Sequence, residues 1–235
     1  MTVPHTEFSG PAPQETLPVA VLLILAAGML DAYTYVGYGG VFANAMTGNI
    51  VILMIHLARA DFTGALRYVC PVAAYLCGVA VAHSLKEKPF AAVVIYPARA
   101  SLAIEVAFLV IAAVIPGLPD ALIVTGIAFV AAMQATAFTR VGTFAFTSVT
   151  TSANLRHLAE SFMAAVVFRN GLAAWRELIF FASVVACFVA GAATGAVATL
   201  RLGHAAVWLP VVLLSGALIL CMPWNQRLHA ILQKN

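Results

Sequence analysis

The chain carries very few charged residues for its length. Lys, Arg, Asp and Glu together make up 9% of the 235 residues, whereas soluble domains typically carry about 25%. Hydrophobic residues make up 63%, and the mean hydropathy is +1.00. A chain this poor in charge cannot cover its surface with polar groups in water. A water-soluble domain is therefore excluded, and the lipid bilayer is the expected surrounding.

Several other features are also missing. The net charge is only +3 and no basic run occurs, so no nucleic-acid partner is expected. No His-Glu-x-x-His, Gly-x-Ser-x-Gly or Walker glycine loop is present, so neither an enzyme nor a cofactor is predicted. The cysteines lie in apolar runs without metal-ligand spacing and are interpreted as small core residues, with no metal site: Cys70, Cys77, Cys187 and Cys221.

Long apolar runs dominate the sequence. A helix of about 20 apolar residues spans a bilayer, and backbone groups in lipid must be satisfied internally. The expected runs are 17–38, 41–57, 68–85, 99–115, 121–139, 144–168, 178–200 and 205–222. We therefore predict an all-α polytopic membrane protein with about six to eight segments. It has a polar tail at 1–16, one transmembrane domain at 17–222 and a short tail at 223–235. Residues 1–15 lack Lys and Arg, so no signal peptide is expected.

A weak internal repeat divides the domain into halves 17–116 and 119–222. At a separation of 104, residues 29–34 align with 133–138, and Thr47-Gly48 with Thr151-Ser152. Gly78 and Ala82 match Gly191 and Gly195 if the second half has a nine-residue insertion. If the second run of each half crosses the bilayer, the halves are parallel. If both runs are broken or re-entrant, the halves are inverted. Chance alignment is the alternative.

Asp31 lies deep in the first run, where an ionised carboxylate costs at least about 2.5 kcal/mol. Its helical face carries Ala27, Gly28, Thr34 and Tyr35 and should point into the bundle. The opposite face, with Leu22, Leu25, Met29 and Val36, is expected to meet lipid. Two roles stay open for Asp31. It either accepts hydrogen bonds from the 39–44 backbone or forms a cation or proton site.

Small polar residues open the second run of each half. They are Asn44, Thr47, Gly48 and Asn49 in the first half, and Ser148, Thr151 and Ser152 in the second. Such residues either allow close helix packing or line the ends of broken helices that bind solutes. The break at Gly37-Tyr38-Gly39-Gly40 favours the second use.

Further polar residues occur in the second half. Arg156 and Glu160 are four residues apart and are expected to pair along one face. Glu105, in the fourth run, is interpreted as a structural partner inside the bundle. Gly191 and Gly195 form a small-xxx-small face, for which close helix packing is the default. A homodimer through such faces is the alternative.

The order Gly28-Met-Leu-Asp31-Ala-Tyr33, Gly40-Val-Phe42 and Met46-Thr-Gly-Asn49 resembles the opening signature of the YoaK-like family of bacterial membrane proteins. The resemblance extends from about residue 17 to 222 and implies a multi-pass protein of the bacterial inner membrane. It implies no substrate. In the second half the family pattern has Gln-Asn-Ala and Thr-Gly. Gln134 is kept here, but Ala135 and Ser152 replace the Asn and the Gly.

These patterns support a small secondary transporter or channel-like permease, coupled to a proton or another cation through Asp31. The expected contacts to a small polar or ionic solute are Asp31, Tyr35, Asn44, Thr47, Gly48, Asn49, Gln134, Ser148, Thr151, Ser152 and Arg156. The alternative is a non-transporting membrane scaffold or assembly protein, in which the polar faces only hold helices together.

Overall fold

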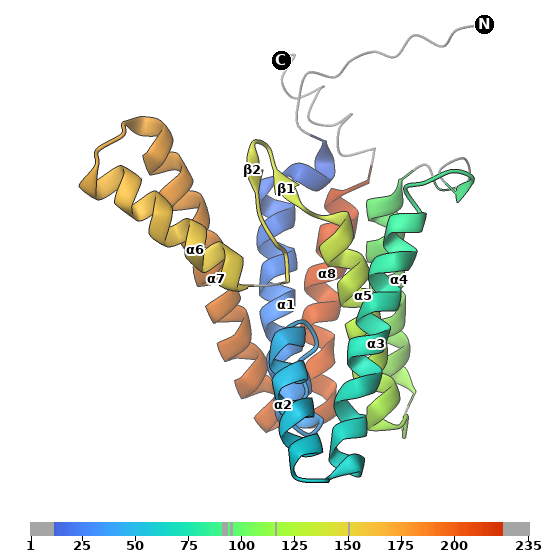
Figure 1. Ribbon diagram of the computed structural model, residues 1–235. Helices are drawn as coiled ribbons and strands as arrows, with labels where there is room; N and C mark the ends of the chain where they lie inside the picture. The colour runs from blue at the N-terminus through green and yellow to red at the C-terminus, as the bar shows by residue number, and fades with distance from the viewer. Residues whose placement is uncertain (1–11, 91–93, 95, 116, 150, 223–235) are drawn as a thin grey trace, which may run out of the picture.

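The computed structural model describes residues 12–222 except 91–93, 95, 116 and 150 (Figure 1). The expected C-terminal tail, 223–235, and residues 1–11 of the expected N-terminal tail lie outside the described residues. The helices are α1 Leu17–Gly37, α2 Met46–Ala58, α3 Phe62–Ser84, α4 Pro97–Val114, α5 Asp120–Ala137, α6 Thr151–Phe162, α7 Leu172–Leu202 and α8 Trp208–Leu220. A two-stranded hairpin, β1 Arg140–Val141 and β2 Phe144–Ala145, lies between α5 and α6 with Val141 paired to Phe144.

Within the described residues, five helical stretches are long and apolar enough to cross a bilayer: Leu17–Gly37, Phe62–Ser84, Pro97–Val114, Asp120–Ala137 and Leu172–Leu220. The last contains α7 and α8, joined by a 3-10 turn at Gly203–Val207 and running in opposite directions (Figure 1). Many large apolar side chains on the outside of the bundle are exposed, as expected for a surface that meets lipid. The protein is a polytopic all-α membrane protein, as predicted.

The second run of each half is only partly helical. Residues 41–45 precede α2 without helical structure, and the sixth run begins with β2 before α6 starts at Thr151. The predicted glycine break ends α1, because Gly39 and Gly40 adopt φ of +76° and +80°, which L side chains rarely allow. After α6, a π-helical turn at Met163–Val167 leads toward α7.

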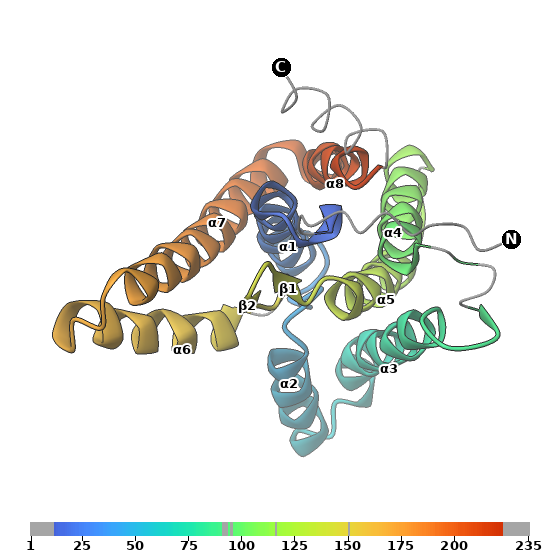
Figure 2. The same cartoon turned by 90° about the horizontal axis from the view of Figure 1, so that it is seen from above.

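The first helix of each half packs mainly on a helix of the other half. Helix α1 packs most extensively on α7, and α5 packs most extensively on α3. Helix α2 lies along α3 as α6 lies along α7, and α1 contacts α8 as α5 contacts α4 (Figure 2). Helices α1 and α5 run in opposite directions along the bundle (Figure 1).

Glycines allow α7 to pack closely on α1 and α3 to pack closely on α5. A Cβ atom at Gly191 of α7 would overlap the backbone of Leu25 in α1. One at Gly78 of α3 would overlap the backbone of Phe129 in α5. These glycines are therefore used for close packing between helices of the chain. Leu25 and Phe129 are 104 residues apart, which is the separation of the sequence alignment.

Helix α7 crosses α1 at the backbone of Leu25 and Met29, whose side chains are partly exposed, and Val36 of the same predicted face is exposed. Helix α1 is central and is buried on several sides, with Leu23, Leu30 and Tyr33 also in the core. Among the cysteines, Cys221 is buried, but Cys70 and Cys77 face outward, because the outer surface of a membrane bundle is also apolar.

Candidate functional site

Helices α2 and α6 are too short to cross a bilayer. Helix α2 contains 13 residues, which correspond to about 20 Å. Helix α6 contains 12 residues and continues directly into the π-helical turn Met163–Val167, so this stretch measures about 25 Å, whereas the hydrocarbon core is about 30 Å thick. Each helix begins part-way along the bundle and runs toward one end, and the two run toward opposite ends (Figure 1). Their N-termini therefore lie between the two ends of the bundle (Figure 1).

An asparagine fixes the start of each short helix. Asn49 in α2 accepts a hydrogen bond from the Phe42 backbone nitrogen at 2.9 Å and donates to the Phe42 carbonyl at 2.8 Å. Asn154 in α6 makes the same pair of bonds with the backbone of Thr147, at 3.3 and 2.9 Å. We call these two arrangements the asparagine clasps. Each links the backbone of a residue that precedes the helix, Phe42 or Thr147, to the first helical turn.

The two clasps are 105 residues apart. At that separation Thr47 aligns with Ser152 and Asn49 with Asn154, whereas the sequence alignment at 104 paired Thr47 with Thr151. Asn154 was missed as a result. The signal that could have found it is the pattern hydroxyl-small-Asn, present as Thr47-Gly48-Asn49 and again at residues 152–154.

Asp31 faces the segment that leads into α2. Its Oδ1 accepts a hydrogen bond from the Asn44 backbone nitrogen at 2.7 Å, which confirms the expected bond from the 39–44 backbone. The Asn44 side chain donates from Nδ2 to the Ala27 carbonyl at 3.1 Å. Because a carbonyl can only accept, this bond fixes the orientation of the amide. The Asn44 Oδ1 atom is buried and has no hydrogen-bond partner among the described residues.

A cavity of about 870 Å³ lies where the two short helices begin. Its lining comes from α1, both short helices, α3 and α7, and consists of Asp31, Ala32, Tyr35, Val36, Phe42, Asn44, Ala45, Met46, Thr47, Tyr75, Val149, Thr151, Ser152, Phe188, Ala192 and Ala196. Asp31 is the only charged residue in this set. Most of the other side chains in the lining that can contact a solute carry hydroxyl groups or aromatic rings.

Six of the predicted contact residues line this cavity. They are Asp31, Tyr35, Asn44, Thr47, Thr151 and Ser152. Tyr35 stacks on Phe42 with ring centroids 4.6 Å apart. Tyr75, Phe42 and Phe188 also line the cavity and were not predicted, because sequence spacing does not reveal which apolar faces of α3 and α7 turn toward α1.

Five predicted contacts do not line the cavity. Asn49 is fully buried, and its amide is used in the clasp. Gly48 packs beside the Phe42 ring. Ser148 is buried and is not among the lining residues, although its neighbour Val149 is. Arg156 is 68% exposed at its side chain and pairs with Glu160 at 3.8 Å, so it supplies no charge to the cavity.

Gln134 is the fifth. With its amide nitrogen turned toward the carboxylate, Gln134 donates to both oxygens of Glu105 at 3.2 and 2.8 Å. Both side chains are 1% exposed. This pair joins α4 to α5 inside the bundle, which confirms the structural interpretation of Glu105. Gln134 does not line the cavity, and its amide contacts Glu105 instead.

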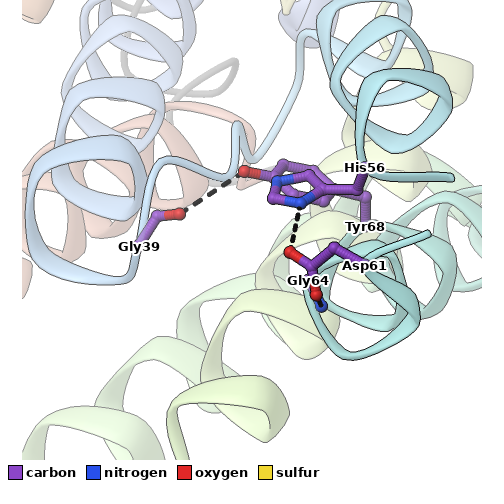
Figure 3. Close-up of polar contacts among 5 residues, drawn as sticks. All are labelled: Gly39, His56, Asp61, Gly64 and Tyr68. Carbon is purple, nitrogen blue, oxygen red and sulfur yellow. Dashed lines mark hydrogen bonds and ion pairs between the residues drawn. The ribbon is translucent and has the colours of Figure 1, made fainter. Parts of the chain in front are cut away.

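A polar cluster anchors the other end of α2 (Figure 3). His56 donates from Nδ1 to Asp61 at 2.8 Å and stacks on Tyr68, with ring centroids 5.5 Å apart. Asp61 also accepts from the Gly64 backbone nitrogen at 2.8 Å, which caps α3. Tyr68 donates to the Gly39 carbonyl at 3.5 Å. The Gly64 N–H and the His56 ring hold the pKa of Asp61 below its ordinary value.

These features define a multi-pass helical membrane protein with two short helices that begin at one cavity. The chain belongs to the family described as "Protein of unknown function (DUF1275)", which matches residues 19–220. The UPF0700 transmembrane protein YoaK of Bacillus subtilis (strain 168) is 25% identical over 205 residues, covering 84% of this chain and 90% of that protein. No solved structure matches.

Proposed function

We propose that the protein is a small permease, working as a secondary transporter or channel, for a small polar or ionic solute in the inner membrane of a bacterium. One observation carries the proposal. The N-terminal ends of α2 and α6 and the carboxylate of Asp31 all line one cavity of about 870 Å³. That volume lies in the usual range of small-molecule sites, about 300–1,000 Å³.

We infer an inverted internal repeat from three features. The first helix of each half packs on a helix of the other half. The α1–α7 and α5–α3 crossings occur at equivalent positions of the two halves, Leu25 and Phe129, and the asparagine clasp occurs in both halves. Helices α1 and α5 run in opposite directions (Figure 1). In this topology α1, α3, α4, α5, α7 and α8 cross the membrane, and α2 and α6 are re-entrant. Inverted repeats with broken helices at the midplane are typical of secondary transporters.

The physical reason for a site here is the backbone of the half-helices. The first four N–H groups of a helix have no partner within the helix, and the helix dipole places about half a positive charge at that end. A helix that began inside the bilayer with no ligand or side chain near it would leave these donors unsatisfied. The clasps give hydrogen-bond partners to the backbone of Phe42 and Thr147, which precede the two helices. The hydroxyl groups of Thr47, Thr151 and Ser152 lie at the first helical turns and line the cavity.

Water access to the cavity tests the proposal. In a variant whose native cysteines are replaced, single cysteines at Thr47 and Ser152 should react with a membrane-impermeant thiol reagent in intact cells or inverted vesicles. A cysteine at the fully buried Thr34 is the matched control and should stay unreactive. If Thr47 and Ser152 are as silent as Thr34 from both sides, the scaffold interpretation replaces the permease.

A further inference from the structure

The two ends of the cavity differ in charge. At the α2 end, the Asp31 carboxyl group accepts the Asn44 N–H, so an acidic group is built into the protein. The same position in the second half is Ala135, which has no carboxylate to offer α6. The residues that line the cavity at the α6 end are Val149, Thr151 and Ser152. The cavity therefore has an acidic end at Asp31 and a helix N-terminus without an acidic neighbour at α6.

A second observation points to a ligand at the acidic end. Asn44 is 2% exposed and lines the cavity, yet its Oδ1 has no donor among the described residues. A buried carbonyl without a partner costs about 1–3 kcal/mol. This oxygen and the Asp31 carboxylate are both acceptors, so together they suit a group with several N–H donors and a positive charge. An ammonium group has that chemistry.

The opposite end suits a carboxylate. A helix N-terminus offers backbone N–H groups and favours negative charge. Thr151 and Ser152 add hydroxyl donors at the first turn of α6. The rest of the lining is mostly apolar and aromatic, with Tyr35, Phe42 and Phe188 among its residues. No cationic side chain lines the cavity within the described residues, so an anion has only the helix end to bind.

We propose that the solute is a zwitterion of the α-amino-acid class with an apolar side chain. The ammonium group pairs with Asp31 and the Asn44 carbonyl, the carboxylate binds the N-terminus of α6, and the side chain packs on the aromatic wall. This inference rests on the proposed permease function and names its substrate class. It requires both charges on one molecule, because each end of the cavity recognises one of them.

Three related compounds separate the contribution of the ammonium group to binding from that of the carboxylate. L-leucine carries both charges, L-leucinamide lacks the carboxylate, and 4-methylpentanoate lacks the ammonium group. Binding is measured by isothermal titration calorimetry on the full chain in detergent at about pH 6.5, below the ordinary pKa of an α-amino group. We expect L-leucine to bind at least about tenfold more tightly than either partial analogue, because each lost charged hydrogen bond costs a factor of that order.

Two variants test which end recognises which charge. Ser152→Asp places a carboxylate at the second residue of α6, where it occupies the helix end and repels the solute carboxylate. L-leucine binding should fall at least about tenfold, and L-leucinamide should become the better ligand. Thr63→Asp is the matched control, because Thr63 is the second residue of α3 and does not line the cavity. It should leave the preference among the probes unchanged.

Asp31→Asn keeps an acceptor for Asn44 but removes the charge, so L-leucine should lose its advantage over 4-methylpentanoate. Equal binding of the three probes, or a preference for either singly charged probe, overturns the zwitterion. The zwitterion proposal is also overturned if none of the three probes binds while proteoliposomes take up another solute. In that case the proposed permease function is kept. The permease itself fails separately, if cysteines at Thr47 and Ser152 are unreactive.

Discussion

The asparagine clasps make a quantitative prediction about stability. Replacing Asn49 by Ala removes two hydrogen bonds, at 2.9 and 2.8 Å, to the backbone of Phe42. Asn49 is 0% exposed, so water cannot replace the lost partner. A neutral hydrogen bond contributes about 1 kcal/mol net, and a buried group left without a partner costs about 1–3 kcal/mol. We therefore expect Asn49→Ala to lower the free energy of unfolding by about 2–4 kcal/mol.

Removing the second clasp should have a similar effect on stability. Asn154 is 3% exposed and makes the corresponding bonds to Thr147, so Asn154→Ala should lower the free energy of unfolding by a similar amount. The assay is equilibrium unfolding in mixed micelles, followed by tryptophan fluorescence. Thr47→Ala, at an exposed position of the same helix turn as Asn49, is the control and should change stability by less than about 0.5 kcal/mol. A cost below about 0.5 kcal/mol for either asparagine variant would refute the reasoning.

Three further predictions concern the carboxylate, the helix crossing and pH. Asp31→Asn should abolish solute uptake in proteoliposomes while the melting temperature stays close to that of the wild type; uptake equal to the wild type would remove Asp31 from the site. Gly195→Ala should destabilise the protein by about 1–3 kcal/mol in the same unfolding assay, because its Cβ would lie 2.6 Å from the Met29 Cα. Gly216→Ala, with its nearest atom at 3.6 Å, should instead stabilise slightly, and equal effects would contradict the close crossing. The folded pKa of Asp61 lies below its ordinary 3.8, so its contribution to stability is present above about pH 3.8 and is lost as the pH falls through the folded value. Asp61→Asn should therefore unfold more easily than the wild type near pH 6, and the difference should shrink in acid; a difference that does not change with pH would argue against this cause.

Local sequence features determined the class of the protein and much of its secondary structure. Low charge and long apolar runs required a membrane bundle, because no aqueous surface could be built from them. The glycines at 37–40 ended α1, since positive φ at Gly39 and Gly40 excludes a continuing helix. The bond between Asp31 and the following segment was also predictable, because a buried carboxylate needs a nearby donor and the segment that follows is close in sequence.

Longer-range packing decided the site. Asn49 and Gln134 have the same amide chemistry as Asn44, but their neighbours in space use it for a clasp and for Glu105. Arg156 lies one turn beyond the start of α6, where it faces outward and pairs with Glu160. Spacing along one helix cannot distinguish these cases, because it does not say which element packs on that face.

The sequence by itself therefore determined a helical membrane protein with two interrupted polar segments and one buried carboxylate. Only the tertiary structure decided that the segments run in opposite directions and begin at a common cavity (Figure 1). The physical reason is the exchange of partners between the halves. Because α1 packs on α7 and α5 packs on α3, residues more than 100 positions apart, such as Asp31 and Ser152, come to line one cavity.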